Sequence, residues 1–132
     1  MLGTILRAGL PLHQGLLNYF DCAQNSFIAA YRKYGKDNKF TIQIEYASSP
    51  KLEGKILILA DTMLATGASI VLAYEKLCQE GEPIHTHLVC PITSAYSIDY
   101  LWKHLPHKRV TLWVSAIDEE LTDRAYIVPG LG

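Results

Sequence analysis

The sequence predicts an α/β fold, in which a largely parallel central sheet is flanked by helices and carries a projecting β-hairpin. The apolar run of residues 56–60 has no polar alternation, which is typical of a parallel strand covered on both faces. Strand-like and helix-like segments then alternate, as right-handed βαβ crossovers require. Apolar residues make up 49% of the 132 residues and charged residues 19%, so we expect a single packed domain over residues 1–132.

The first half of the chain predicts a strand, a helix and a hairpin. Residues 3–6 read as a strand, after which Gly9 is expected to supply the backbone freedom of a turn. Pro11 suits the first turn of a helix, and the apolar spacing carries that helix to about Asp21. Residues 26–32 and the alternating segment 40–46 predict a hairpin joined by the turn-rich residues 35–38, with one face toward solvent.

The second half repeats the strand and helix order. After the strand at 56–60, the apolar residues Ile70, Tyr74, Leu77 and Cys78 recur at helical spacing, and Gly81 marks the helix end. Residues 84–92 predict a strand, 94–104 a helix and 110–116 another strand. Each of the first two strands therefore leads into a helix that can return the chain parallel to its neighbour.

Charge and composition exclude several classes of function. A formal net charge of −1 offers no basic surface for a nucleic acid, so we expect no nucleic-acid partner. The longest apolar stretch has five residues, far short of the roughly 20 that span a membrane, and no secretory signal is visible, so we expect a cytoplasmic protein with no membrane partner. The three cysteines lack the spacing of a metal site, so we expect no protein-held metal.

The strongest local signal follows the central strand. Asp61 stands at its carboxyl end, and a loop of small residues ending at Gly67 and Ser69 opens the next helix. Small residues let several backbone N–H groups converge on an anion, and the helix dipole adds attraction, so the pattern is typical of a phosphate site. The structural alternative is that Asp61 closes the loop while Thr66 or Ser69 caps the helix.

The loop also resembles a known family. The string DTMLATGAS at 61–69 is similar to the DPMLATGGS form of uracil phosphoribosyltransferases, which join uracil to the ribose-phosphate of phosphoribosyl pyrophosphate. The resemblance continues in order through ILRAGL at 5–10, YR at 31–32, EY at 45–46 and YIVPGLG at 126–132. It implies the fold of the type I phosphoribosyltransferases.

The resemblance also implies roles for particular residues. Asp61 and Arg32 are the expected catalytic residues, and main-chain groups of Ile127 and Gly132 are expected to bind uracil. The residues expected to bind phosphoribosyl pyrophosphate are Arg7, Arg32, Asp61, Thr62, Met63, Leu64, Ala65, Thr66, Gly67, Ala68 and Ser69. The structural alternatives are a surface ion pair for Arg7 and an ordinary Pro-Gly turn for residues 126–132.

The implied reaction also has a cofactor and a partner. Mg²⁺ is expected to be held mainly by the diphosphate of the substrate, while the acidic run Asp118, Glu119 and Glu120 is expected to be a solvated loop. Exposed strand edges and the arm at 40–46 predict a homo-oligomer, either a dimer or a tetramer. A site that donates a hydrogen bond to a uracil carbonyl would discriminate against cytosine.

The sequence departs from the family in three respects. Thr62 replaces the usual proline, and Ala68 replaces the second glycine, which is compatible only with a negative φ at Ala68. Relative to the family, the domain looks incomplete at both termini. We therefore expect a chain that ends at Gly132 to bind phosphoribosyl pyrophosphate better than it turns over uracil, and the alternative function is a non-catalytic module in assembly or regulation.

Overall fold

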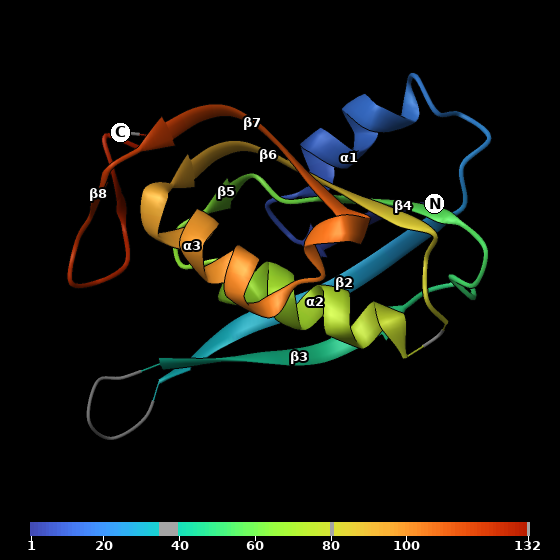
Figure 1. Cartoon of the computed structure of the whole chain (residues 1–132), viewed down its shortest axis with the longest axis horizontal. Coiled ribbons are helices and arrows are strands. Elements are labelled where there is room, and N and C mark those ends of the chain that lie inside the picture. Colours follow the sequence, from blue (N-terminus) through green and yellow to red (C-terminus); the bar gives the residue numbers. More distant parts are fainter. Residues whose placement is uncertain (35–39, 80, 132) are drawn as a thin grey trace.

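A computed structural model describes residues 1–34, 40–79 and 81–131, and these are built around one sheet (Figure 1). The strands lie in the order β3 (Phe40–Ser48), β2 (Asn25–Tyr34), β1 (Leu2–Leu6), β4 (Ile56–Ala60), β6 (His85–Ser94) and β7 (Val110–Asp118). The short strand β5 (Met63–Leu64) pairs with the far half of β6. All neighbours are parallel except the β2–β3 hairpin, so the predicted α/β class is confirmed.

Helices lie on both faces of this sheet. α1 (Leu10–Leu17) follows β1, α2 (Ala68–Cys78) follows β5, α3 (Ala95–His104) follows β6, and the 3₁₀ segment η1 (His107–Arg109) leads into β7. α2 and α3 contact each other on one face, whereas α1 lies on the opposite face (Figure 1). The two-residue strands β8 (Glu120–Leu121) and β9 (Ile127–Val128) form a small antiparallel hairpin after β7.

The core lies between the sheet and the pair of helices α2 and α3. Leu57 and Leu59 of β4, Leu88 of β6 and Ile70 of α2 have no exposed surface. Successive strand residues point to opposite faces, so the alternate leucines of β4 both face the helices. Burying one such side chain stabilises the fold by roughly 1.5–3 kcal/mol, and β4 and α2 therefore anchor both ends of the loop between them.

The face of the sheet under α1 is only partly covered. A cavity of about 410 Å³ on this face is lined by Leu16, Phe20, Ile58, His87, Val89 and Trp113. Ile56 is 52% exposed and Ile58 half-buried, so the prediction that residues 56–60 are covered on both faces is wrong. The reason is that α1 has eight residues, or roughly 12 Å at 1.5 Å per residue, which is too short to cover several strands.

The region around α1 differs from the prediction in two ways. The helix ends at Leu17, short of Asp21, because the Leu16 carbonyl accepts the N–H groups of both Tyr19 and Phe20 at 3.0 Å and closes a turn. Gly9 has φ −70°, so it needs no special backbone freedom. A Cβ at Gly9 would instead overlap Thr4 Oγ1, and glycine is required there for space.

The remaining predicted strands and helices are confirmed with small shifts in their bounds. On β3, Ile42 and Ile44 are partly buried while Thr41, Gln43 and Glu45 are exposed, which is the expected hairpin with one solvent face. The predicted turn at 35–38 lies outside the described residues. Within the described ranges, no helix is both long and apolar enough to cross a membrane.

We expect Gly9→Ala to lower the free energy of unfolding by about 1–3 kcal/mol, because the added methyl group overpacks the turn against Thr4 and Ile5. Gly15 is the matched control, since a methyl group added there would have no other atom within 4 Å. Gly15→Ala is expected to stabilise α1 by roughly 0.5–1 kcal/mol. Urea unfolding followed by circular dichroism measures both, and equal effects would contradict the steric role of Gly9.

Candidate active site

The loop of residues 61–69 lies at the carboxyl edge of the sheet. The Asp61 N–H donates to the Val89 carbonyl at 3.1 Å, so the loop begins tied to β6. It then runs along β6 through β5, where Met63 is paired with Ile92, before α2 begins. This is the edge at which α/β proteins bind their ligands.

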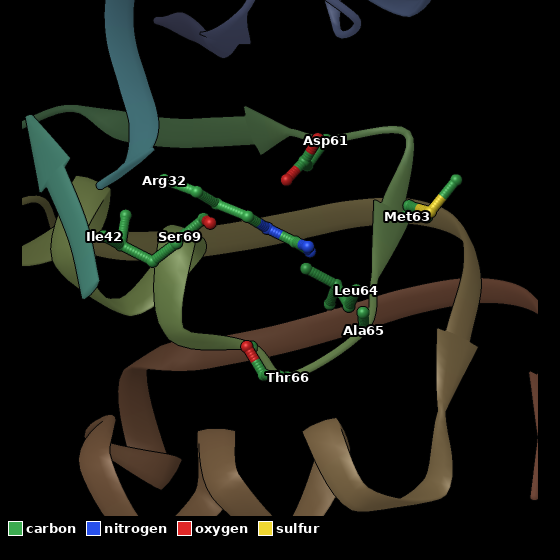
Figure 2. Close-up of a pocket in the computed structure, with 9 residues that line it drawn as sticks. Arg32, Ile42, Asp61, Met63, Leu64, Ala65, Thr66 and Ser69 are labelled. Carbon is green, nitrogen blue, oxygen red and sulfur yellow. The ribbon is translucent and has the colours of Figure 1, made fainter. Parts of the chain in front are cut away.

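A cavity of about 70 Å³ opens between this loop and the β2–β3 hairpin. It is lined by Arg32, Ile42, Asp61, Met63, Leu64, Ala65, Thr66, Gly67 and Ser69. Figure 2 shows the Arg32 side chain reaching from β2 toward the loop, with its guanidinium group between Asp61 and Leu64. A permanent cation therefore faces a loop of small residues and a helix N-terminus, a combination suited to phosphate oxygens.

Gly67 sets the shape of the loop where it meets α2. Its φ is +80°, in the left-handed region that favours glycine, and a Cβ there would lie 3.2 Å from the Ser97 carbonyl oxygen. Ala68 is the first residue of α2. Among the described non-glycine residues, positive φ occurs at Ala125 alone, so φ at Ala68 is negative, as the replacement of glycine by alanine requires. The Ala68 N–H donates to Thr66 Oγ1 at 3.4 Å, a long hydrogen bond within the loop, while the N-cap residue of α2 is Gly67.

Asp61 is the ionisable carboxyl group of this cavity. Burial raises the pKa of Asp61 from 3.8 to about 6, although the Thr62 N–H donates to its Oδ1 at 2.8 Å and favours the charged form. The carboxyl group thus changes charge just below neutral pH. At pH 7 it is available as an anion that can accept hydrogen bonds from hydroxyl groups or bind a cation.

The structure brings most of the predicted loop residues together. All of residues 61–69 line the cavity with Arg32 except Thr62, whose backbone supports Asp61, and Ala68, which begins α2. Arg7 is not in this cavity: it is exposed after β1 and lines a second cavity of about 320 Å³ with Leu6, Ala29, Ala30, Tyr31 and Glu45. Both cavities border β2: Arg32 belongs to this strand, and Ala29, Ala30 and Tyr31 of the same strand line the cavity with Arg7.

The segment at 126–131 forms a third cavity of about 360 Å³ together with Met63. Ile127 is 7% exposed and lies in β9, whereas the predicted contact Gly132 lies outside the described residues. Met63 also lines the cavity that contains Arg32. The loop and the chain end thus present neighbouring cavities that share one side chain.

Sequence reasoning missed two residues of the site. Ile42 stands opposite Arg32 in the antiparallel β2–β3 register, a pairing that the hairpin spacing could have indicated. The solvated-loop prediction holds for Glu119. It is wrong for Glu120, which is exposed but lies in β8, and for Asp118, whose Oδ2 accepts the Gly130 N–H at 3.0 Å. In the described part of the chain, no group of three His, Cys, Asp or Glu side chains could hold a metal ion.

The family model and the related sequences that match this chain carry the same family name. The sequence model of the family described as uracil phosphoribosyltransferase matches residues 2–132. A Porphyromonas gingivalis protein of that name is 49% identical over 132 residues, which is all of this chain and 61% of that protein. A protein of the same name from Methanothermobacter thermautotrophicus is 35% identical over 98% of this chain and 57% of its own. The chain thus spans about three fifths of the length of these relatives.

Solved structures share the fold. The AQ2163 protein from Aquifex aeolicus superposes with a TM-score of 0.88 and 31% identity, over 99% of this chain and 60% of that chain. The orotate phosphoribosyltransferase from Aeropyrum pernix superposes with a TM-score of 0.61 over 88% of this chain and 59% of its own, at 18% identity, and shows the fold alone. The expected type I phosphoribosyltransferase fold is confirmed.

We expect Asp61→Asn to flatten the pH dependence of stability. Because the folded pKa is raised, the folded chain holds this proton more tightly than the unfolded chain between pH 3.8 and about 6. The free energy of unfolding therefore falls as pH rises through that range, and the cost persists at higher pH. The asparagine variant should be more stable than the parent at pH 7, by roughly 1–3 kcal/mol.

Denaturant titrations at several pH values between 4 and 8 measure this difference. Asp99→Asn is the control, since Asp99 is an exposed carboxyl group on α3. Parallel stability curves for the parent and Asp61→Asn would contradict the raised pKa.

Proposed function

Because the chain belongs to the uracil phosphoribosyltransferase family, we propose that it transfers the phosphoribosyl group of phosphoribosyl pyrophosphate to uracil, giving uridine monophosphate and pyrophosphate. One observation carries the proposal: Arg32 and the loop of residues 61–69 line the same cavity at the carboxyl edge of the sheet. That cavity combines a cation, a helix N-terminus and one carboxyl group, which suits a sugar phosphate.

In this proposal, the loop and the two arginines bind different parts of the donor substrate. The backbone N–H groups of residues 65–69 hold the 5′-phosphate at the start of α2, and Asp61 accepts hydrogen bonds from the ribose hydroxyls. Arg7, at the end of β1, lies at the same sheet edge because β1 and β4 are parallel neighbours. Arg7 and Arg32 together contact the phosphates, where a planar guanidinium can bind two oxygens at once.

Uracil is assigned to the cavity formed by Met63 and residues 126–131. Main-chain groups of Ile127 and Gly132 bind the polar edge of the base in this proposal. The shared Met63 side chain supports the assignment, because it lines both the base cavity and the donor cavity. A main-chain donor opposite a uracil carbonyl would face the amino group of cytosine, which accounts for selectivity.

The reaction requires the protein mainly to hold the two substrates in line. The base nitrogen bonds to the anomeric carbon and loses its proton to solvent, while the bond from that carbon to pyrophosphate breaks and pyrophosphate leaves with the bonding electron pair. Positive charge builds on the ribose, and negative charge builds on the leaving group. The Arg7 and Arg32 side chains stabilise the leaving group, and the ionised Asp61 orients the sugar, so that the reacting atoms meet at contact distance.

Mg²⁺ fits this site as an ion held mainly by the substrate. The described residues that line the donor cavity include one carboxylate, that of Asp61. The Thr66 and Ser69 side chains add hydroxyl oxygens. One carboxylate suits a hard cation that keeps most of its oxygen ligands from a diphosphate and water. Bound there, the ion would neutralise diphosphate charge.

The cellular setting follows from the same proposal. Uracil recycling is pyrimidine salvage, and we place the protein in the cytoplasm as a homo-oligomer, either a dimer or a tetramer. Exposed apolar side chains on the open face of the sheet support association, among them Phe20, Trp113 and Ile117 at 48%, 56% and 53% exposed. The edge strands β3 and β7 offer a second route to self-pairing.

A second candidate function is binding without turnover. The alternative expected from the sequence is a module that keeps the donor site and acts in assembly or regulation. The two candidates share the cavity around Arg32. They differ in whether uridine monophosphate is formed.

We expect Arg32→Ala to lower kcat/KM for phosphoribosyl pyrophosphate by roughly 10–100-fold, since a hydrogen bond to a charged group contributes about 1.5–3 kcal/mol. Lys33→Ala is the matched control, because Lys33 is the next residue on β2 and points to the other face of the hairpin. Uridine monophosphate formation with Mg²⁺ and calorimetric titration of the donor measure both variants. Donor binding by the parent chain without product would favour the binding module, and unchanged kcat/KM and donor affinity in Arg32→Ala would contradict the assigned donor site.

A further inference from the structure

The neighbouring strands β6 and β7 each end in a side chain that contacts the wall of a different proposed substrate cavity. Ser94 is the last residue of β6 and Asp118 is the last residue of β7, and they are partners in the parallel β6–β7 register. Neither belongs to the residues that line the donor or base cavity. Each nevertheless makes a hydrogen bond to the backbone of one of those cavity walls.

Ser94 holds the donor loop. Its Oγ donates to the Ala65 carbonyl oxygen at 2.5 Å and accepts the Ser97 N–H at 3.0 Å as the cap of α3. The residue has no exposed surface, so water does not compete for either bond. The middle of the loop is thereby fixed to the end of β6.

Asp118 holds the base segment. Its Oδ2 accepts the Gly130 N–H at 3.0 Å, in a turn where Gly130 has φ +57°. Thr122 supports the other end of the β8–β9 hairpin, since its Oγ1 accepts the Tyr126 N–H at 3.1 Å and its N–H donates to the Tyr126 carbonyl at 2.9 Å. A carboxylate forms a stronger hydrogen bond than a neutral acceptor, so Asp118 is a firm anchor for the turn.

We propose that Ser94 and Asp118 are a pair of positioning residues that set the donor loop and the base turn relative to each other through the β6–β7 register. This inference rests on the proposed function, since it assigns the two walls to the two substrates. The same register holds from Thr86 paired with Val110 to Ser94 paired with Asp118, with Pro91 as the one position that it skips, so the two anchors lie side by side at the end of the ladder. Neither residue lines the donor or the base cavity, so each acts through the backbone segment that it holds.

The pairing has a chemical consequence. Transfer needs the base nitrogen within contact distance of the anomeric carbon, and a misplacement of about 1 Å can cost on the order of a hundredfold in rate. The two cavities share Met63 and otherwise belong to separate segments of the chain. A sheet ladder is a stiff link between them, whereas two unanchored loops would not hold the substrates in line.

Steady-state kinetics on the full 132-residue chain, with donor titration by calorimetry, test the pair. We expect Asp118→Ala to raise the KM for uracil about tenfold while the Kd for phosphoribosyl pyrophosphate is unchanged. Asp118→Asn should restore the uracil KM, because its amide oxygen can still accept the Gly130 N–H. Glu119→Gln is the control for loss of charge at an exposed neighbour.

Ser94→Ala should have the opposite effect: the Kd for phosphoribosyl pyrophosphate should rise, while the KM for uracil stays close to that of the parent. Ser94→Thr should keep the parent Kd for phosphoribosyl pyrophosphate. Amide hydrogen exchange at Gly130 gives a readout that does not need turnover: protection should fall in Asp118→Ala and persist in Asp118→Asn. If Asp118→Ala keeps both the parent uracil KM and Gly130 protection while the parent enzyme is active, the positioning role is wrong and the proposed function stands. If the parent chain neither binds the donor nor forms product, the proposed function fails, and this inference fails with it.

Discussion

The site depends on one constraint, which is that both ends of the loop at residues 61–69 are fixed in the same core. Leu57 and Leu59 of β4 and Ile70 of α2 are fully buried in one core cluster. The strand and the helix therefore cannot move apart without opening the core. Leu64 is 2% exposed and packs in the same core, and β5 pairs Met63 and Leu64 with β6, so the first half of the loop is fixed as well. The small residues 65–69 that follow lie between this fixed segment and α2, where their backbone can approach a ligand.

The rest of the candidate site is arranged around that loop by the sheet. β2 and β3 bring Arg32 and Ile42 to one side, β6 brings Ser94, and β7 brings Asp118 with the turn that it anchors. Parallel strands end at a common edge, so residues that are far apart in the sequence meet there without long connections. The opposite face of the sheet is less complete, because the short helix α1 leaves the cavity under Phe20 and Trp113 open.

The sequence was sufficient for most of the fold and for much of the loop at residues 61–69 that lines the candidate site. Hydrophobic period and turn residues predicted the strands and helices, because those signals arise from the local geometry of the backbone. They failed where the outcome depended on tertiary packing: the exposure of Ile56 reflects the length of α1, and the need for glycine at position 9 reflects the approach of Thr4. The anchoring role of Asp118 was hidden for a similar reason, since its partner Gly130 is twelve residues away and the acidic run around it resembles solvated surface.

We propose that the backbone of residues 65–69 binds a phosphate group of the donor. Heteronuclear NMR of the labelled chain during titration with phosphoribosyl pyrophosphate and Mg²⁺ detects such binding residue by residue. We expect saturable shifts concentrated in the amides of Ala65 through Ser69 and in the Arg32 side chain, with inorganic sulfate giving weaker shifts at the same amides. Shifts confined to other parts of the chain, or none at donor concentrations that saturate related enzymes, would contradict it.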